Sequence, residues 1–495
     1  MVASTAEYGR LARVTAALAA VVLVAGVASA VSRSAGDSDA ASKSEPATSS
    51  TTELPTTVAP TAPPEMPVEW DARVVDLVGF VEGARGLAFQ RPVVVDFLSA
   101  EQFSAEARVA PEDLSALEQD EAEGSEGFQR SLVLTTCDVD VGEAANLLRD
   151  EGTLAFYLVD DERIVIRGTE VTPEARPVLV HELTHALQDQ HFDLGRTFDS
   201  DGAQLAFRAL AEGDALRVER AYEAEVAGED QGVAVYAFDT LDDPTLAAVP
   251  AALAAIDAAP YVFGATFVEL LERRGGVEAL NAAFAAPPTT EEHLFDPFTY
   301  IAGQQPVTVL PPSGPDGSSD PFDEGDFGAI TWYLLLAERI DPLQALAAVD
   351  GWAGDAFVAY DDQGRTCTTE FFVGDTPADD DETGAALDSW AETMPSGAAT
   401  VERLAAGVEL TACDPGPDAA GPAAGRALEV LPVPAYRTAL VVLGLDSDFT
   451  EGESACVASE LLARVSYDRL FIVLTEPDPP PDLDDALGAA LGACV

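Results

Sequence analysis

The residues best suited to chemistry are His181, Glu182 and His185, which form the pattern His-Glu-x-x-His within a largely apolar stretch. The whole chain has only four histidines, and three of them, including His191, lie in this short segment. Positions i and i+4 of a helix share one face, so the outer two residues can direct imidazole nitrogens at one Zn²⁺ ion. The carboxylate between them can take a proton from an attacking water and later protonate a leaving amine. The pattern therefore predicts zinc-assisted hydrolysis, with Glu182 as the catalytic residue.

A catalytic zinc site needs a third protein ligand, and the chain offers two candidates. Glu212 lies on a second helical stretch, far enough along the chain for one turn and a return helix. His191 follows His185 at the spacing of the metzincin pattern, but Gln188 stands where that pattern has a glycine. We therefore expect His181, His185 and Glu212 to bind the metal, with His191 as the alternative.

Two supporting roles have candidates as well. Asp189 or Asp214 could orient a ligand from behind, because metal-bound histidines usually donate their second ring nitrogen to such a group. His293 or Tyr261 could stabilise the oxyanion of a tetrahedral intermediate.

The local sequence places the motif on a helix. Thr172 is a typical N-cap, Pro173 a first-turn proline, and Glu174 an acid near the positive end of the helix dipole. Pro177 still falls near the first turn, so it shifts the start of the helix without breaking it.

Other elements must pack around this helix. A hairpin is predicted directly before it, because two β-rich runs flank an Asp-Asp-Glu turn. Further elements follow from apolar periodicity: a strand at 91–97, a helix from Ser99, helices over 204–285, a helical pair over 327–349, and β-like runs at 365–373 and 407–413.

The wider string around the motif, His-Glu-Leu-Thr-His-Ala-Leu-Gln-Asp-Gln-His-Phe followed by Ala-Glu-Gly-Asp-Ala, carries a family resemblance. It resembles the gluzincins, the thermolysin-like zinc peptidases whose third ligand is a glutamate on the next helix. It also looks like a poorly characterised family of secreted bacterial proteins with this zinc signature, over about Val75 to Asp362. The resemblance implies a zincin-like fold and a zinc metallopeptidase, in which a sheet edge before the zinc helix holds the substrate backbone as an added strand.

Composition limits the partners. The chain has 495 residues, with 26 basic and 87 acidic side chains and a net charge of −61. Such a surface repels nucleic acid and anionic membranes, so we expect a peptide or protein substrate and no nucleic acid. Five cysteines without a Cys-x-x-Cys pattern suggest disulfides in an exported protein. We pair Cys367 with Cys413 and Cys456 with Cys494, which leaves Cys137 over, although other pairings are open.

The chain divides into five predicted parts. Residues 1–31 have the basic, apolar and small-residue regions of a secretory signal peptide, with an uncleaved membrane anchor as the alternative. Residues 32–67 are a disordered Ser/Thr/Pro-rich linker. An N-terminal α+β portion (68–150), which could be a prodomain-like cover, precedes the metallopeptidase core and its extension (151–415). A small helical module (426–495) ends the chain.

We therefore predict an α+β protein. Its mainly helical zincin-like core has a small sheet and hairpin before the zinc helix, and a small disulfide-linked helical module follows at the C-terminus. The predicted function is that of an exported, secreted or cell-surface zinc metallopeptidase. The alternative is a catalytically inactive protein of the same fold that serves as a cell-surface binding or scaffolding protein. The presence of Glu182 favours the enzyme, because a scaffold needs no base.

Overall fold

The structure is a computed structural model and describes residues 67–108, 127–135, 139–151, 153–198, 200–228, 249–314, 321–416, 425–475 and 480–495. The predicted signal segment, most of the linker and Cys137 lie outside these residues. The described helices are α2 (Val75–Arg85), α3 (Ala100–Ala107), α5 (Val141–Glu151), α6 (Ala175–Phe192), α7 (Asp201–Ala227), α8 (Ala251–Ala285), α9 (Glu292–Phe295), α10 (Pro297–Ala302), α11 (Gly328–Ala337), α12 (Pro342–Val349), α13 (Pro377–Ala391), α14 (Ala427–Val430), α15 (Val433–Asp446), α16 (Glu451–Leu462), α17 (Tyr467–Thr475) and α18 (Pro481–Cys494). The described strands are β1 (Val94–Leu98), β2 (Ala155–Leu158), β3 (Arg163–Arg167), β4 (Asp323–Gly325), β5 (Trp352–Asp361), β6 (Thr366–Gly374), β7 (Ala399–Leu404) and β8 (Gly407–Cys413).

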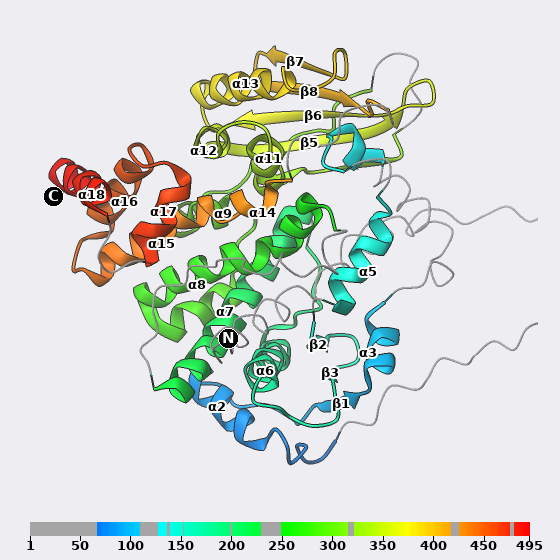
Figure 1. Cartoon of the computed structure of the whole chain (residues 1–495), viewed down its shortest axis with the longest axis vertical. Helices are drawn as coiled ribbons and strands as arrows, with labels where there is room; N and C mark the ends of the chain where they lie inside the picture. Colours follow the sequence, from blue (N-terminus) through cyan, green and yellow to red (C-terminus); the bar gives the residue numbers. More distant parts are fainter. Residues whose placement is uncertain are drawn as a thin grey trace, which may run out of the picture.

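The protein is α+β and mainly helical, as expected, with two small sheets at opposite ends of a helical middle layer (Figure 1). One large apolar cluster joins α7, α8 and α11 to the five-stranded sheet and the C-terminal helices. A second, smaller cluster lies between α2, the three-stranded sheet and α6. The predicted metal helix α6 belongs to this second cluster and packs against α7.

The three-stranded sheet has the order β1-β3-β2. The predicted hairpin is present: β2 and β3 are antiparallel, and β1 pairs with the other side of β3 in parallel. Ile164, Val165 and Ile166 of the central strand are fully buried, which anchors the sheet beside α6. In the order β1-β3-β2, strand β2 is an edge strand, and it lies next to α6.

Helix α6 starts slightly later than the sequence suggests. Its first residue is Ala175, and its N-cap is Glu174, whose backbone is helical and whose side chain makes no capping hydrogen bond. Thr172, the predicted N-cap, instead accepts a 3.3 Å hydrogen bond from the N–H of Ala175. Pro177 lies in the first turn, where its missing N–H removes no helical hydrogen bond.

Helices α7 and α8 cross at very close range. A Cβ built on Gly213 would overlap the backbone of Gly264, and one built on Gly264 would overlap the backbone of Ala209. Only glycine permits this approach. The contact brings side chains of α8 close to the face of α7 that also meets α6.

The five-stranded sheet has the order β4-β5-β6-β8-β7 and is antiparallel throughout. The sequence indicated β6 and β8, and the predicted helical pair before them corresponds to α11 and α12. Strand β5 begins at Trp352, where the sequence suggested only the close of that pair. The predicted disulfide between Cys367 and Cys413 is present and joins directly opposed residues of β6 and β8.

The C-terminal segment is helical, as predicted, and the second predicted disulfide, Cys456–Cys494, links α16 to α18. Its apolar residues are part of the large core, and Tyr333 of α11 donates a 2.8 Å hydrogen bond to the carbonyl of Val430. Two described helices, α8 and the stretch Ala427–Asp446, are long and apolar enough to cross a membrane. Their most apolar windows are 83% and 72% buried inside the protein, which is typical of core helices. The disulfides point to an extracellular or otherwise oxidising environment.

Candidate metal centre

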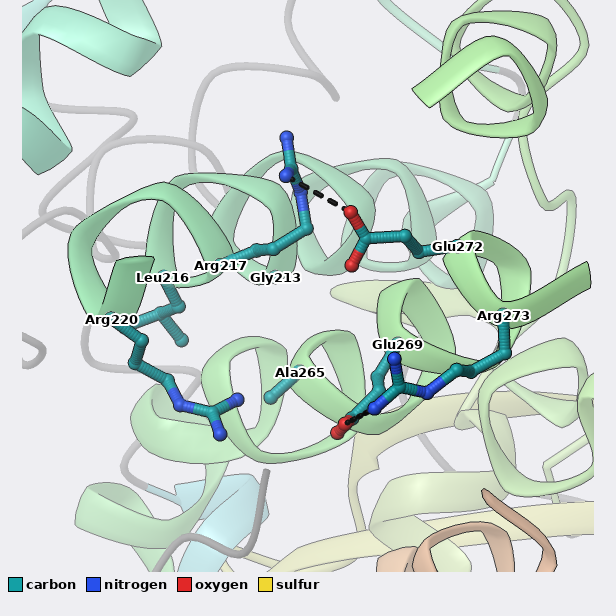
Figure 2. A pocket seen from close by; sticks show the side chains of 8 residues that line it. All are labelled: Gly213, Leu216, Arg217, Arg220, Ala265, Glu269, Glu272 and Arg273. Carbon is teal, nitrogen blue, oxygen red and sulfur yellow. Dashed lines mark hydrogen bonds and ion pairs between the residues drawn. The ribbon is translucent and has the colours of Figure 1, made fainter. Parts of the chain in front are cut away.

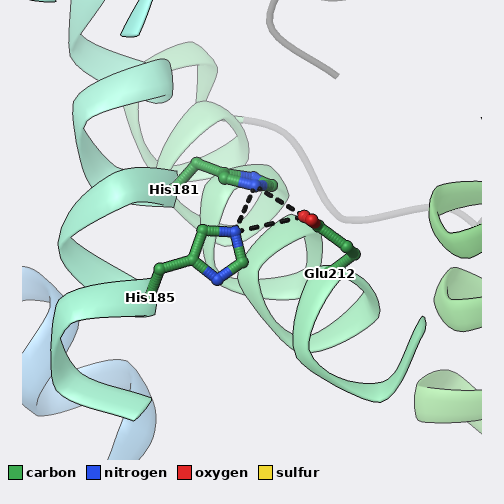
Figure 3. A group of neighbouring side chains, drawn as sticks. All are labelled: His181, His185 and Glu212. Carbon is green, nitrogen blue, oxygen red and sulfur yellow. Dashed lines mark hydrogen bonds and ion pairs between the residues drawn. The ribbon is translucent and has the colours of Figure 1, made fainter. Parts of the chain in front are cut away.

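Two helices bring the three predicted ligands together. Figure 3 shows His181 and His185 leaving one face of α6 while Glu212 reaches them from α7. The Nε2 atoms of the two histidines are 3.0 Å apart, and Oε2 of Glu212 lies 3.2 Å from the first and 3.1 Å from the second. All three residues are buried, with 3–6% of their surface exposed. These three side chains, the metal-facing group, could hold a metal ion.

The second ring nitrogen of each histidine, Nδ1, has a hydrogen-bond partner of its own. Nδ1 of His181 lies 3.1 Å from Oε2 of Glu219, which is two turns beyond Glu212 on α7. Nδ1 of His185 lies 3.0 Å from Oε1 of Gln188, one turn later on α6. When each Nδ1 carries the proton and donates it, the lone pair on Nε2 faces the centre of the group.

The orientation of the Gln188 amide is set by its own donors. Its Nε2 donates to Oδ2 of Asp214 at 2.8 Å and to the carbonyl of Ala211 at 3.0 Å, so its oxygen must face His185. Asp214 is fully buried and is held by Arg85 of α2, whose Nε lies 2.8 Å from Oδ2 of Asp214. A continuous chain of contacts therefore runs from α2 to a metal-facing histidine.

Glu182 lies beside the group and is 4% exposed. Its carboxyl accepts a hydrogen bond from the backbone N–H of Tyr157, on edge strand β2. Burial raises the pKa of Glu182 to about 7, although the neighbouring His181 and His185 lower it. A dication beside this carboxyl would lower the pKa further and favour the ionised form.

The electrostatics of the ligands reflect close pairing. Burial alone lowers the pKa of His181, but hydrogen bonds to Glu212 and Glu219 raise it well above its usual value. Burial alone raises the pKa of Glu212, but the charge of His185 and the hydrogen bonds from both histidines hold it well below its usual value. The site thus keeps a carboxylate ionised in a buried position.

The other predicted site residues take different places. Asp189 does not orient a histidine: its carboxylate accepts 2.8 Å hydrogen bonds from the Tyr157 hydroxyl and from the N–H of Leu194. Asp214 acts one step further back, through Gln188. His191 is not in the metal-facing group, and its Nε2 lies 2.8 Å from the carbonyl of Ala88.

The two candidates for oxyanion stabilisation, His293 and Tyr261, lie in different places, and only Tyr261 is near the metal-facing group. His293 sits on α9, where Nδ1 accepts from the N–H of Thr289 at 3.2 Å and Nε2 lies 3.0 Å from the carbonyl of Gln304. Both of its ring nitrogens are therefore used within its own segment. Tyr261 of α8 lies beside the metal-facing group, with its ring stacked at 6.4 Å from the ring of His181.

Three supporting residues were missed from the sequence: Glu219, Gln188 and Arg85. The first two carry a positional signal, because Glu219 is seven residues after Glu212 and Gln188 is three after His185, so each shares a helical face with a ligand. Arg85 gives no such signal, because it reaches Asp214 from a distant part of the chain.

A separate pocket lies between α7 and α8 (Figure 2). It is lined mainly by charged side chains that pair with one another, including Arg217 with Glu272 at 3.1 Å and Arg273 with Glu269 at 3.7 Å. None of the metal-facing residues lines it, although Gly213 is next to Glu212.

Comparison of the chain with protein-family models, with curated proteins and with solved structures gives no match. Functional interpretation therefore rests on the geometry of the metal-facing group itself.

Proposed function

We propose that the protein is an exported, zinc-dependent peptidase of gluzincin-like design, in which His181, His185 and Glu212 hold the metal and Glu182 is the catalytic base. The observation that carries this proposal is the convergence of two imidazole nitrogens and one carboxylate oxygen within 3.0–3.2 Å of one another, beside a buried glutamate.

The donor set fits zinc. Zinc sites in proteins are tetrahedral with bonds of about 2.0–2.2 Å to nitrogen and oxygen, so ligand atoms should lie roughly 3.3 Å apart. The three observed separations are close to this value. Two histidines and one glutamate also make the three-ligand set that leaves a fourth position open for chemistry.

Zinc held by these residues supplies a Lewis acid that makes water a nucleophile near neutral pH. Glu182, which is buried beside these residues, would accept the proton of the attacking water and deliver it to the leaving amine. The hydroxyl of Tyr261, on the α8 face that stacks against His181, is the candidate donor to the developing oxyanion. Glu219 and Gln188 keep both imidazoles in the tautomer that directs Nε2 toward the metal.

The edge strand β2 supports a peptide substrate. Strand β2 pairs with β3 on one side only, so its other edge is not paired with a described strand. The backbone N–H of Tyr157, on β2, interacts with Glu182. A peptide added along this edge would use main-chain groups alone and would pass beside the catalytic base.

Metal content of purified full-length protein tests the proposal. We expect one zinc per chain in the wild type, loss of zinc in Glu212→Ala, and retention in the control His191→Ala. Glu182→Gln should retain zinc while hydrolysing a peptide library at least about a hundredfold more slowly.

The outcomes separate the two functions. A protein that binds no zinc in any form, even after zinc is supplied, refutes the metal site. A protein that binds zinc but whose function is unchanged in Glu182→Gln is a binding or scaffolding protein and no peptidase.

A further inference from the structure

Buried polar atoms without partners lie next to the metal-facing group. Nη2 of Arg208 and both carboxyl oxygens of Asp257 are buried and have no hydrogen-bond partner within the described part of the chain. Asp257 is only 2% exposed. Each unpaired buried polar group costs about 1–3 kcal/mol, so three together require an explanation.

These atoms belong to side chains that adjoin the metal ligands. Arg208 is one helical turn before Glu212, and its Nε lies 3.5 Å from Oε1, the carboxylate oxygen that does not face the histidines. The guanidinium also lies over the Tyr261 ring, 5.8 Å from its centroid. Asp257 is one turn before Tyr261 on α8 and therefore shares its face.

The unpaired atoms of Arg208 and Asp257 can both donate to an anionic ligand when Asp257 is protonated. Burial raises the pKa of Asp257 to about 8, and the charge of Glu212 adds to this effect, while Arg208 and Arg149 lower the pKa. Among the described residues, neither arginine forms an ion pair with this carboxyl. The raised pKa favours the protonated carboxyl, which can donate a hydrogen bond, while the guanidinium of Arg208 keeps one donor free.

The burial of the metal ligands favours a small substrate. His181, His185 and Glu212 are at least 94% buried, and the pocket of Figure 2 does not reach them. The end of a short peptide fits such a closed site better than a loop of a folded protein does.

We propose that Arg208 and Asp257 form a subsite for the C-terminal carboxylate of a short peptide, whose scissile bond lies at the metal-facing group. One carboxylate oxygen accepts from Nη2 of Arg208 and the other from the Asp257 carboxyl. The protein is then a peptidase that acts at carboxyl ends of peptides. This inference rests on the proposed function and adds its substrate class.

The test compares two ligands that differ only at the carboxyl end. N-acetyl-Ala-Ala-Phe and its C-terminal amide are titrated by calorimetry into zinc-loaded full-length Glu182→Gln, which prevents turnover. We expect the acid to bind at least about tenfold more tightly than the amide, as one charge-assisted hydrogen bond provides. Adding Arg208→Met should reduce the preference to less than about twofold, whereas adding the control Arg220→Met, on the same helix, should preserve it.

Two further measurements, zinc content and peptide hydrolysis, are made on protein that retains Glu182. They distinguish a failure of the subsite from a failure of the proposed function. Equal binding of acid and amide, with zinc bound and hydrolysis intact, overturns the subsite and leaves the peptidase. An unchanged preference in Arg208→Met also overturns it. Absence of zinc and hydrolysis overturns the proposed function instead.

If Arg208→Met loses zinc because Arg208 adjoins Glu212, then Asp257→Leu serves in its place. A loss of preference of about threefold or more supports the subsite, and no loss refutes it.

Discussion

Replacing Glu219 by Gln should weaken zinc binding without unfolding the protein. Glu219 contacts Nδ1 of His181 at 3.1 Å, and both side chains are buried, with 8% and 5% of their surface exposed. The variant keeps the size and shape of the side chain and removes one negative charge. Its effect therefore reports what the carboxylate does for the imidazole.

Two contributions set the size of the effect. A buried hydrogen bond to a charged acceptor is worth about 1–2 kcal/mol more than one to a neutral acceptor. The glutamine amide can also rotate and donate to Nδ1, and this favours the tautomer whose Nε2 carries a proton and cannot bind metal. Together these contributions predict a zinc affinity lower by about 10–100-fold, the range typical of such outer contacts.

The assay is competition for zinc against a chromophoric chelator at pH 7.5. The matched control is Glu225→Gln, which makes the same change at an exposed position on the same helix and should leave affinity within about twofold. Equal zinc affinity in Glu219→Gln and the wild type would refute the reasoning, because His181 would then need no carboxylate behind it.

Two further predictions concern buried charge away from the ligands. Arg85→Met removes the guanidinium that contacts the fully buried Asp214 at 2.8 Å but leaves Arg217, which contacts the other carboxylate oxygen at 3.2 Å, so urea denaturation should show a loss of about 1.5–3 kcal/mol; a loss below about 0.5 kcal/mol would contradict this. Burial raises the pKa of Glu370 from 4.5 to about 8, so the folded state keeps a proton that the unfolded state releases between these values. The wild type should therefore lose stability as the pH rises through that window, and Glu370→Gln should gain in Tm relative to it as the pH rises; parallel Tm curves would be inconsistent with a protonated Glu370.

The sequence predicted the metal-facing group because its geometry is mostly local. The spacing of His181 and His185 alone puts them on one helical face, and the length of the following segment allows a return helix that carries Glu212. The hairpin before α6, the strands β6 and β8 and both disulfide pairs also followed from local patterns and from the few cysteines available.

What the sequence did not predict depends on packing between distant segments. Strand β5 is buried along nine of its ten residues, so it lacks the alternation of polar and apolar residues that identifies a half-exposed strand. The pairing of Arg208 with Glu212 is local and follows from their spacing on one helix. The burial of Asp257 without a hydrogen-bond partner among the described residues depends on the crossing of α7 and α8 at Gly213 and Gly264, which the sequence does not show.

The role of the N-terminal portion follows from the same long-range contacts. A prodomain-like cover would be expected to leave the metal site intact when removed. Helix α2, however, places the buried Arg85 against Asp214, and Asp214 holds the Gln188 amide that orients His185. Removing α2 would leave Arg217, 3.2 Å from the other carboxylate oxygen, as the only remaining arginine among the described residues that contacts this buried carboxylate, and would weaken the support behind His185. The segment that begins at Val75 therefore supports the side chains that orient His185, and an activating cleavage that keeps this support must fall before Val75.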